Sequence, residues 1–424
     1  MTTTETKPDI DVEEFRAKAR EWLAANAIKR GAPGSENMGR PSGEMGSEEE
    51  KRGIARAKEF QAKLADAGFA GITYPKEYGG AGLTRAHQAA FSSESAAYVL
   101  PTFPMYIGQG MCLPTIHTHG TEEQKKRFMP NLINGSEIWS QLFSEPGAGS
   151  DVAGLQMRAE KFGDEWVLNG QKVWTTGAHY SEWGEVIVRT DPDLPKHQGL
   201  TMFLVDLHAP GVTVRPLRQI TGEAHFNEVF FDDVRVPDSQ RLDEVGSGWK
   251  VALTTLMNER MSIGGAGGGG GSRRAGGDNA LVRLAKERGL WSEREHRDRV
   301  VELYVQNRVL SMLRERMAMA ARKAIPGPEF SMLKLIGARL GAAQSELSAS
   351  LVGASGIAWE ASEGSAGQTA SIGLLSSRSG KIAGGTDEVM LNILGERVLG
   401  LPQDPRVDKE VPFRELKVGT VKGG

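Results

Sequence analysis

A loop rich in glycine and hydroxyl residues, at positions 141–151, has the composition of a ligand-binding turn. Two glycines and a proline separate Ser144 from Ser150 in the segment Gln-Leu-Phe-Ser-Glu-Pro-Gly-Ala-Gly-Ser-Asp. Glycines admit positive φ and let a ligand approach the backbone closely, and neighbouring N–H groups can form a concavity that binds anions. Ordinary tight turns use the same residues. The loop therefore predicts contacts with phosphate or flavin oxygens, and a plain tight turn is the alternative.

The residues after this loop predict β structure rather than a dinucleotide-binding unit. No helix and strand of the required kind follow the Gly-Ala-Gly triplet, and the sequence contains no phosphate loop ending in Gly-Lys-Ser/Thr. Residues 166–174 are instead predicted to form a hairpin, with Asn169-Gly170 as its type I′ turn. The second strand runs into Trp174-Thr175-Thr176. A tryptophan there can be a core aromatic, but the adjoining threonines and the upstream loop favour contact with a ligand.

With these two segments the sequence resembles the acyl-CoA dehydrogenase family. Residues 144–151 are similar to the family's flavin loop and residues 174–176 to its second flavin segment, and the resemblance extends from about residue 13 to about residue 405. It implies FAD as the cofactor, with Ser144 and Thr176 hydrogen-bonded to the isoalloxazine ring. Trp174 would pack against that ring, and Ser150 would meet the diphosphate or the thioester substrate. The cofactor-binding positions that the resemblance implies are Leu142, Ser144, Ser150, Trp174, Thr175, Thr176, Thr386 and Glu388.

The resemblance places the catalytic base on a helix after the β region. Residues 381–389 resemble the family's loop before its last helix, where many members carry a glutamate just before a Gly-Thr pair, but this sequence has Gly384 there. A minority of members, including isovaleryl-type and long-chain enzymes, place the base on an earlier helix, and Leu-Met-Asn-Glu-Arg at 256–260 matches that motif. Glu259 is therefore the expected base, with Arg260, Gly384 and Ser150 at the substrate. A solvated helix face is the alternative for Glu259 and Arg260.

The implied activity is α,β-dehydrogenation of an acyl-CoA thioester to the trans-2-enoyl-CoA, with electrons passing to an electron-transfer flavoprotein. We expect an acyl group bulkier than a short straight chain, because Gly384 leaves room beside the α- and β-carbons. Such an enzyme serves fatty-acid or lipid catabolism by β-oxidation. Family members pack their C-terminal helices together, so we expect a homotetramer, or a heterotetramer with a related chain.

Two departures from the family pattern keep other functions open. The family's Arg-x-x-Phe-Gly segment is missing, and the nearly all-glycine stretch 264–277, with Arg273 and Arg274, is predicted as a flexible linker in its place. Ser350 occupies a position where the family often has glutamine. Both changes affect flavin contacts across a subunit boundary, so the alternative is a non-catalytic or half-equipped flavin-binding subunit of a hetero-oligomer. An acyl-CoA oxidase or flavin monooxygenase on the same fold is a third hypothesis.

The order of elements predicts an α+β protein with the acyl-CoA dehydrogenase fold. Helical patterns run from about residue 12 to 132 and from about 237 to 401, and six short β runs between them predict a small antiparallel barrel or sandwich. Gly68 is the expected end of one N-terminal helix. One apolar stripe of the C-terminal helices is predicted at Leu303, Leu310, Leu313 and Met317. The expected domains are an N-terminal helical domain at 1–135, a central β domain at 136–240, a C-terminal helical bundle at 241–405 and a tail at 406–424.

Composition excludes several classes of partner. The formal net charge of −3 gives no basic footprint for nucleic acid or an anionic membrane. Cys112 is the only cysteine, so no intrachain disulfide or cysteine-based metal site can form, which fits a reducing compartment. The N-terminus has no apolar core of a secretory signal, and no apolar run approaches the ~18 residues of a membrane span. We therefore expect a cytoplasmic protein with no membrane span and no metal site.

Overall fold

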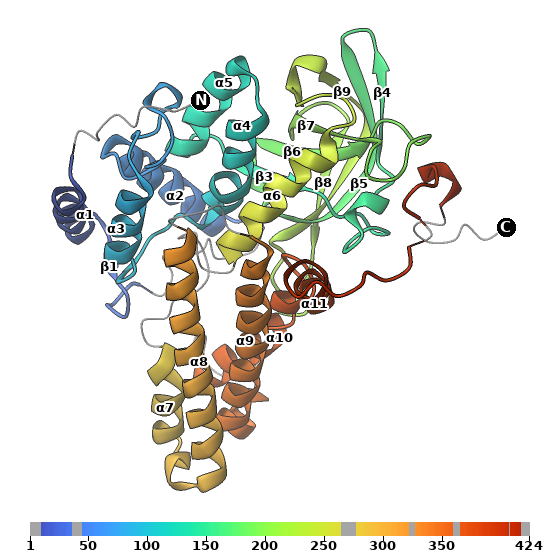
Figure 1. The fold of residues 1–424 in the computed structure, drawn as a ribbon. Coiled ribbons are helices and arrows are strands. Elements are labelled where there is room, and N and C mark those ends of the chain that lie inside the picture. Colours follow the sequence, from blue (N-terminus) through green and yellow to red (C-terminus); the bar gives the residue numbers. More distant parts are fainter. Residues whose placement is uncertain are drawn as a thin grey trace. The chain divides into compact units, whose positions relative to one another are not determined.

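The part of the chain described by the structure, a computed structural model, comprises residues 10–35, 45–263, 277–321, 327–358, 365–406 and 408–416 (Figure 1). The chain divides into two units. Unit 1 contains residues 1–218, 224–258 and 406–424, and unit 2 contains residues 219–223 and 259–405. Most of the glycine-rich stretch, with Arg273 and Arg274, lies outside the described residues. No described helix is long and apolar enough to cross a membrane.

Helices in the first part of unit 1 bury one face each around a shared apolar core. Helix α2 shows how the sequence determines the start, the buried face and the end of such a helix. Ser47 caps its start by accepting a hydrogen bond from the Glu50 N–H at 3.2 Å. Phe60 and Leu64 lie on its buried face. Gly68, with φ +75°, ends the helix as predicted. The helices are α1 (Val12–Asn26), α2 (Glu48–Asp66), α3 (Arg85–Ser95), α4 (Leu113–His119) and α5 (Glu122–Asn134), and a two-stranded sheet joins β1 (Ile28–Lys29) and β2 (Tyr98–Val99).

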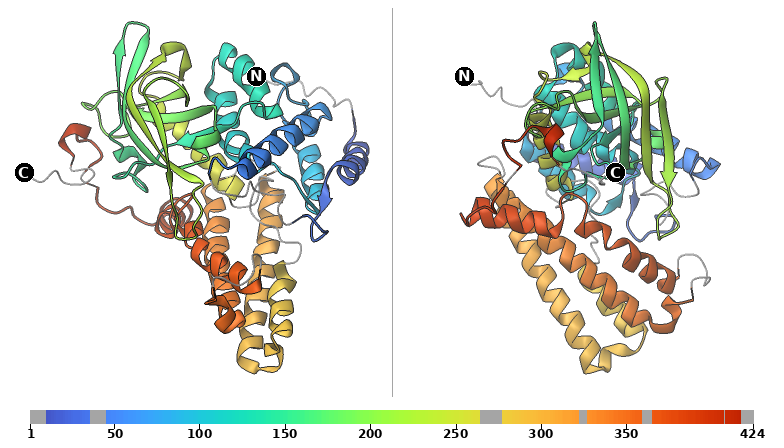
Figure 2. Two further views of the ribbon diagram at one scale, coloured as in Figure 1. Left: turned by 180° about the vertical axis from the view of Figure 1, so that it is seen from behind. Right: turned by 90° about the vertical axis from the view of Figure 1, so that its right-hand side faces the viewer.

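A mixed sheet, with eight strands among the described residues, forms the β part of unit 1. Its strand order is β10-β7-β6-β4-β5-β9-β8, and β3 pairs with β6. The pairings of β6 with β3 and with β4 are parallel and the others are antiparallel, so the predicted antiparallel unit is a mixed sheet instead. Figure 2 shows its green strands side by side. The strands are β3 (Trp139–Leu142), β4 (Arg158–Phe162), β5 (Glu165–Thr176), β6 (Trp183–Arg189), β7 (Leu200–Asp206), β8 (Val212–Leu217), β9 (Phe226–Pro237) and β10 (Arg241–Leu242).

The hairpin predicted at residues 166–174 is wrong, because these residues belong to one continuous strand, β5. A type I′ turn needs positive φ at both central residues, and of the Asn-Gly pair only Gly170 has it, at +144°. The pair instead forms a bulge at a register shift between β5 and β9. The Asn169 side chain secures this bulge, since it donates to the Asp233 carboxylate at 2.9 Å and accepts from the Asp233 N–H at 3.0 Å. The chain reverses earlier, between β4 and β5 at Gly163, where φ is +61°.

Unit 2 consists largely of long helices that pack through apolar stripes. The stripe predicted on α8 is confirmed, because Leu303, Leu310 and Met317 are buried in one cluster with Leu333 and Leu340 of α9. Figure 1 shows α7, α8 and α9 as neighbouring rods within this unit. The prolines at positions 326 and 328 predict a break in the helical pattern after residue 324, and that position lies outside the described residues. The helices are α7 (Gly277–Glu287), α8 (Arg294–Ala321), α9 (Ser331–Val352), α10 (Ala366–Ser376) and α11 (Asp387–Ile393), and α6 (Gly248–Ile263) contains the last residues of unit 1 and the first residues of this part of unit 2.

Candidate functional site

The loop at 144–151 and the segment at 174–176 lie next to each other in unit 1. The loop follows β3, the segment ends β5, and the Val173 N–H donates to the Ser144 carbonyl at 2.9 Å. Leu142, the last residue of β3, has its side chain fully buried in the core of the sheet. The sheet therefore brings together the two segments that the sequence singled out for flavin contacts.

A buried ion pair beneath the loop fixes its shape. The Lys172 side chain is fully buried, and its Nζ lies 2.9 Å from the Glu145 carboxylate and donates to the Phe143 carbonyl at 3.0 Å. The same carboxylate accepts from the N–H groups of Gln156 and Met157, at 2.6 and 3.0 Å. Burial lowers the pKa of Lys172, and the attraction of Glu145 opposes that shift. Removing one partner of a buried pair leaves an uncompensated charge and costs about 3–5 kcal/mol, so the loop depends on both.

A bulge in β5 turns Trp174 out of the sheet. The register between β5 and β9 shifts between Lys172 and Thr175, and Trp174, within this shift, has φ +61°. Such a left-handed conformation is strained for a bulky residue, and strained residues of this kind cluster at functional sites. The Trp174 side chain is 58% exposed and meets Phe226 edge-on, with ring centres 5.8 Å apart. Trp174 is therefore not the core aromatic that the sequence left open as the alternative.

The hydroxyl residues of the two segments occupy different environments. Ser150 is exposed, and a Cβ added at the neighbouring Gly149 would meet nothing within 4 Å, so this end of the loop is uncovered. Thr176 is half-buried, whereas Thr175 is buried and its hydroxyl oxygen has no hydrogen-bond partner within the described residues. A buried polar atom of this kind normally meets a ligand or water. The open loop, the exposed ring and this hydroxyl fit a flavin dinucleotide.

Glu259 and Arg260, near the end of α6, are both partly buried. Burial lowers the pKa of Arg260, and the neighbouring Glu259 carboxylate opposes that shift. Lys334 of α9 is only 3% exposed, and burial lowers its pKa against the attraction of three carboxylates, which belong to Asp387, Glu259 and Glu388. Glu259 therefore does not lie on the fully solvated helix face that was its alternative interpretation.

The loop before α11 has a backbone that suits glycine. Gly384 has φ +68° and Gly385 has φ +91°, both in the left-handed region. The buried Lys334 ammonium donates to the Gly385 carbonyl. Thr386 caps α11, because its hydroxyl accepts a backbone N–H from the first turn at 3.2 Å, and Glu388 is exposed in that turn. Two glycines, a buried cation and a helix cap therefore fix this loop.

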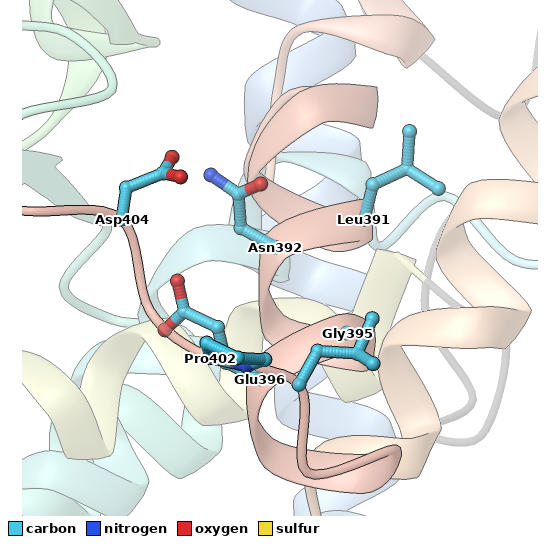
Figure 3. A pocket seen from close by; sticks show the side chains of 7 residues that line it. Leu391, Asn392, Gly395, Glu396, Pro402 and Asp404 are labelled. Atoms are coloured by element: carbon cyan, nitrogen blue, oxygen red, sulfur yellow. The ribbon is translucent and has the colours of Figure 1, made fainter.

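A separate pocket of about 170 Å³ lies near the C-terminal end of unit 2 (Figure 3). In the figure the polar ends of Asn392, Glu396 and Asp404 face the same space. The pocket contains none of the residues that the sequence assigned to cofactor or substrate. Its lining is formed by Leu391, Asn392, Gly395, Glu396, Leu401, Pro402 and Asp404.

Sequence reasoning missed the charged residues that support both loops. Lys172 and Glu145 hold the loop at 144–151, and Lys334 holds the loop at 384–386. The available signal was a lysine in an apolar context, since Lys334 stands within Met-Leu-Lys-Leu-Ile and Lys172 directly precedes Val-Trp. A buried cation requires an acceptor, but the sequence does not say which one the fold supplies.

The chain has a helical part, a β part and a second helical part in that order, and its sheet joins the two segments predicted to contact a flavin. Three models of acyl-CoA dehydrogenase domains match the sequence: the N-terminal domain at residues 11–136, the middle domain at 140–234 and the C-terminal domain at 246–399. The chain therefore belongs to the acyl-CoA dehydrogenase family, whose members are FAD-dependent oxidoreductases. The predicted family, fold class, enzyme class and cofactor are confirmed.

Similar proteins extend this assignment over most of the chain. Acyl-CoA dehydrogenase IpdE1 of Mycolicibacterium smegmatis is 37% identical over 93% of this chain and 99% of its own length. A solved structure of the Tcur3481-Tcur3483 steroid ACAD is 26% identical, with a TM-score of 0.77, and covers 93% of this chain and 98% of its own. The ChsE4-ChsE5 complex from Mycobacterium tuberculosis is 25% identical, with a TM-score of 0.71 and coverages of 95% and 100%.

Proposed function

We propose that this protein catalyses the α,β-dehydrogenation of an acyl-CoA thioester to the trans-2-enoyl-CoA and passes the electrons to an electron-transfer flavoprotein. The observation that carries the proposal is the hydrogen bond of 2.9 Å from Val173 to Ser144, which joins the loop at 144–151 to the segment at 174–176. With Trp174 exposed beside this junction, the arrangement supports a flavin site built from both segments.

FAD, when bound, accepts the β-hydrogen of the thioester together with its electron pair. We assign Ser144 and Thr176 to hydrogen bonds with the isoalloxazine ring, because both are partly accessible at the junction of the two segments. Ser150, at the uncovered end of the loop, is assigned to the diphosphate or to the thioester. The remaining cofactor contacts are assigned to Leu142, Trp174, Thr175, Thr386 and Glu388.

Glu259 is assigned as the base that removes the α-proton. The α-proton of a thioester is a weak acid, so a carboxylate must lie within hydrogen-bonding reach in a partly dry site. The partial burial of Glu259 supports this role, and we assign Arg260 and Gly384 to the substrate. Because Gly384 has no side chain, we expect a bulky acyl group. A higher kcat/KM for butanoyl-CoA than for every branched, long or ring-bearing thioester would contradict this substrate assignment.

An apolar face on α8 supports assembly into a tetramer of one or two chain types. Its exposed residues recur at three- and four-residue spacing, and their exposed fractions lie between 45% and 59% for Val301, Val305, Val309 and Met312. A contiguous apolar helix face of this kind is typical of protein–protein contacts. Light scattering of the pure protein tests the assembly. A stable monomer that dehydrogenates acyl-CoA would contradict it.

A half-equipped subunit of a hetero-oligomer is the second candidate. It is favoured by Ser350, which is exposed near the end of α9 where many family members have glutamine. Two similar structures carry paired names, and one of them is described as a complex. The two candidates differ in whether the pure chain retains flavin. For either one we place the protein in the cytoplasm and in the β-oxidation of lipids.

The visible spectrum of the protein purified alone, followed by a panel of acyl-CoAs without oxygen, separates these candidates. A yellow protein that bleaches supports the dehydrogenase, and rapid oxygen uptake afterwards identifies an oxidase instead. A protein that turns yellow only with a partner chain supports the second candidate. Trp174→Ala should weaken flavin retention, whereas Phe162→Ala, at an aromatic residue of β4 that is 57% exposed, should not. Equal retention by both variants would contradict the assignment of the 174–176 segment.

A further inference from the structure

Residues 408–416, here called the C-terminal strap, fold onto the β part of unit 1 (Figure 1). The strap lies beyond residue 399, where the match to the C-terminal family model ends. Its Phe413 N–H donates to the Leu194 carbonyl and its Arg414 N–H donates to the Pro192 carbonyl, both at 3.0 Å. Phe413 is 8% exposed, so the strap is docked by a buried aromatic ring as well as by backbone hydrogen bonds.

Arg189 connects the strap to the residues that follow the flavin loop. Its guanidinium carbon lies 3.6 Å from the centre of the Phe413 ring, a cation–π contact in a site where Arg189 is only 3% exposed. One terminal nitrogen of the same guanidinium donates to the carbonyls of Ala153 and Leu155, at 2.6 and 3.3 Å, and the other donates to the Lys196 carbonyl at 2.8 Å. Burial lowers the pKa of Arg189 to about 10, so the side chain remains a cation at neutral pH.

Lys196 forms the second connection, and this one reaches the loop itself. Its ammonium lies between two carboxylates, 2.9 Å from that of Asp151 and 2.5 Å from that of Asp408 in the strap. Burial lowers the pKa of Lys196, but the two carboxylates raise it by more, and Lys196 in turn holds the pKa of Asp408 below its usual range. Lys196 is 8% exposed, whereas the side chain of Asp151 is 55% exposed and that of Asp408 is 33% exposed, so the bridge joins a buried cation to two carboxylates that solvent reaches.

The position of Asp151 gives this bridge a chemical consequence. Asp151 directly follows Ser150, the residue assigned to a diphosphate, and an unpaired carboxylate there would repel that anion. Lys196 neutralises Asp151 and holds it in place. Gly149 and Ser150, at this end of the loop, are both exposed.

We propose that Lys196 is a positioning residue, which the C-terminal strap holds against Asp151 so that the end of the loop at Ser150 is fixed for a diphosphate-bearing ligand. The inference rests on the proposed function of the loop. Two ligands of this enzyme class carry a diphosphate, namely FAD and the coenzyme A part of the substrate. The strap then contributes to ligand affinity without touching the ligand.

The test compares three variants of the full-length chain. Asp408→Asn weakens the bridge to Lys196, and Phe413→Ala removes the docking ring. Arg414→Ala is the matched control on the same strap, because Arg414 pairs at 2.8 Å with Asp193, between β6 and β7, and both side chains are more than half exposed. Amide hydrogen exchange at residues 149–155 is measured in the flavin-free protein. The Kd for FAD is measured in the same protein, and the Kd for coenzyme A in the flavin-loaded protein.

We expect Asp408→Asn and Phe413→Ala to speed amide exchange at 149–155 by about tenfold. The same two variants should raise one of the two Kd values by about 3- to 10-fold. For Arg414→Ala, the exchange rates and both Kd values should stay within about twofold of wild type. The Kd that changes identifies the ligand. Unchanged exchange, or faster exchange with both Kd values unchanged, overturns the inference. If the wild-type chain binds no FAD under any condition, the proposed flavin function fails instead. The exchange at 149–155 and the Kd for coenzyme A, then measured in the flavin-free protein, still decide the role of the strap.

Discussion

Glu185→Gln is predicted to remove a pH-dependent loss of stability from unit 1. Glu185 lies in β6 with no solvent exposure, and its Oε1 accepts a hydrogen bond from the Thr255 hydroxyl at 2.5 Å. Thr255 also shares a hydrogen bond of 2.9 Å with Thr115, whereas Oε2 of Glu185 has no partner among the described residues. Burial is the main influence, and it raises the pKa of Glu185 to about 8.

The sign of the effect follows from proton binding. An unfolded glutamate ionises near pH ~4.3, whereas Glu185 in the folded protein keeps its proton up to about pH 8. Between these two values the folded state binds more protons than the unfolded state. The stabilising contribution is therefore complete below the unfolded pKa and is lost as pH rises through the folded pKa. At about 1.4 kcal/mol per pH unit, the loss across this window is on the order of 5 kcal/mol.

Urea unfolding at pH 5, 6.5 and 8, followed by tryptophan fluorescence, measures this dependence. Glutamine keeps the shape and a polar group but does not ionise, so the variant should lose less stability than wild type as pH rises. Glu160→Gln is the control, because the Glu160 side chain is 61% exposed on β4. A difference between wild type and Glu185→Gln that is constant over the three pH values would refute the assignment of a buried, protonated carboxyl group.

Two further substitutions test the buried ion pair at the loop 144–151 and the bulge at Gly170 in β5. Lys172→Met leaves the buried Glu145 carboxylate without its cation, so the free energy of unfolding, measured by thermal unfolding, should fall by about 3–5 kcal/mol. Lys161→Met is the control, because the Lys161 side chain is half-exposed, and its free energy of unfolding should fall by less than about 0.5 kcal/mol. Wild-type stability in Lys172→Met would contradict the buried pair. Gly170→Ala should lower the free energy of unfolding by about 1–3 kcal/mol, because φ is +144° and the new Cβ would lie 2.8 Å from the Met157 side chain. Gly149→Ala is its control, because a Cβ at Gly149 meets open space. Equal stability of the two alanine variants would argue against the bulge.

Local sequence patterns predict those features of the fold, such as helix ends and apolar helix faces, that depend on residues close together in the sequence. The stripe on α8 follows from apolar residues at helical spacing, and the end of α2 follows from a glycine just after the helical pattern. The hairpin failed for the opposite reason. Asn169-Gly170 satisfies the composition of a turn, but its long-range pairing with β9 and its hydrogen bonds to Asp233 make it a bulge. Pairing across about sixty residues is not readable from the pair itself.

A sequence motif predicts some residues of the candidate site, but it does not predict the residues that support the site through tertiary contacts. Ser144 and Trp174 are predicted as flavin contacts from their segments, and the fold places those two segments next to each other. The support from Lys172 was not found, because its acceptor comes from a different part of the chain. The strap was described only as a tail, since nothing local to Asp408 or Phe413 indicates that Lys196 and Arg189 receive them.

The rate at which a saturating acyl-CoA bleaches the flavin of Glu259→Gln, without oxygen, tests the central claim most directly. Glutamine keeps the shape and polarity of the side chain but cannot accept the α-proton, so the rate should fall by about 10²–10⁴-fold while the spectrum of the bound flavin before substrate is unchanged. Glu346→Gln, at a half-exposed carboxylate of α9 paired with Arg378, is the control and should bleach at the wild-type rate. Bleaching of Glu259→Gln at a near wild-type rate would contradict the assignment of Glu259 as the base.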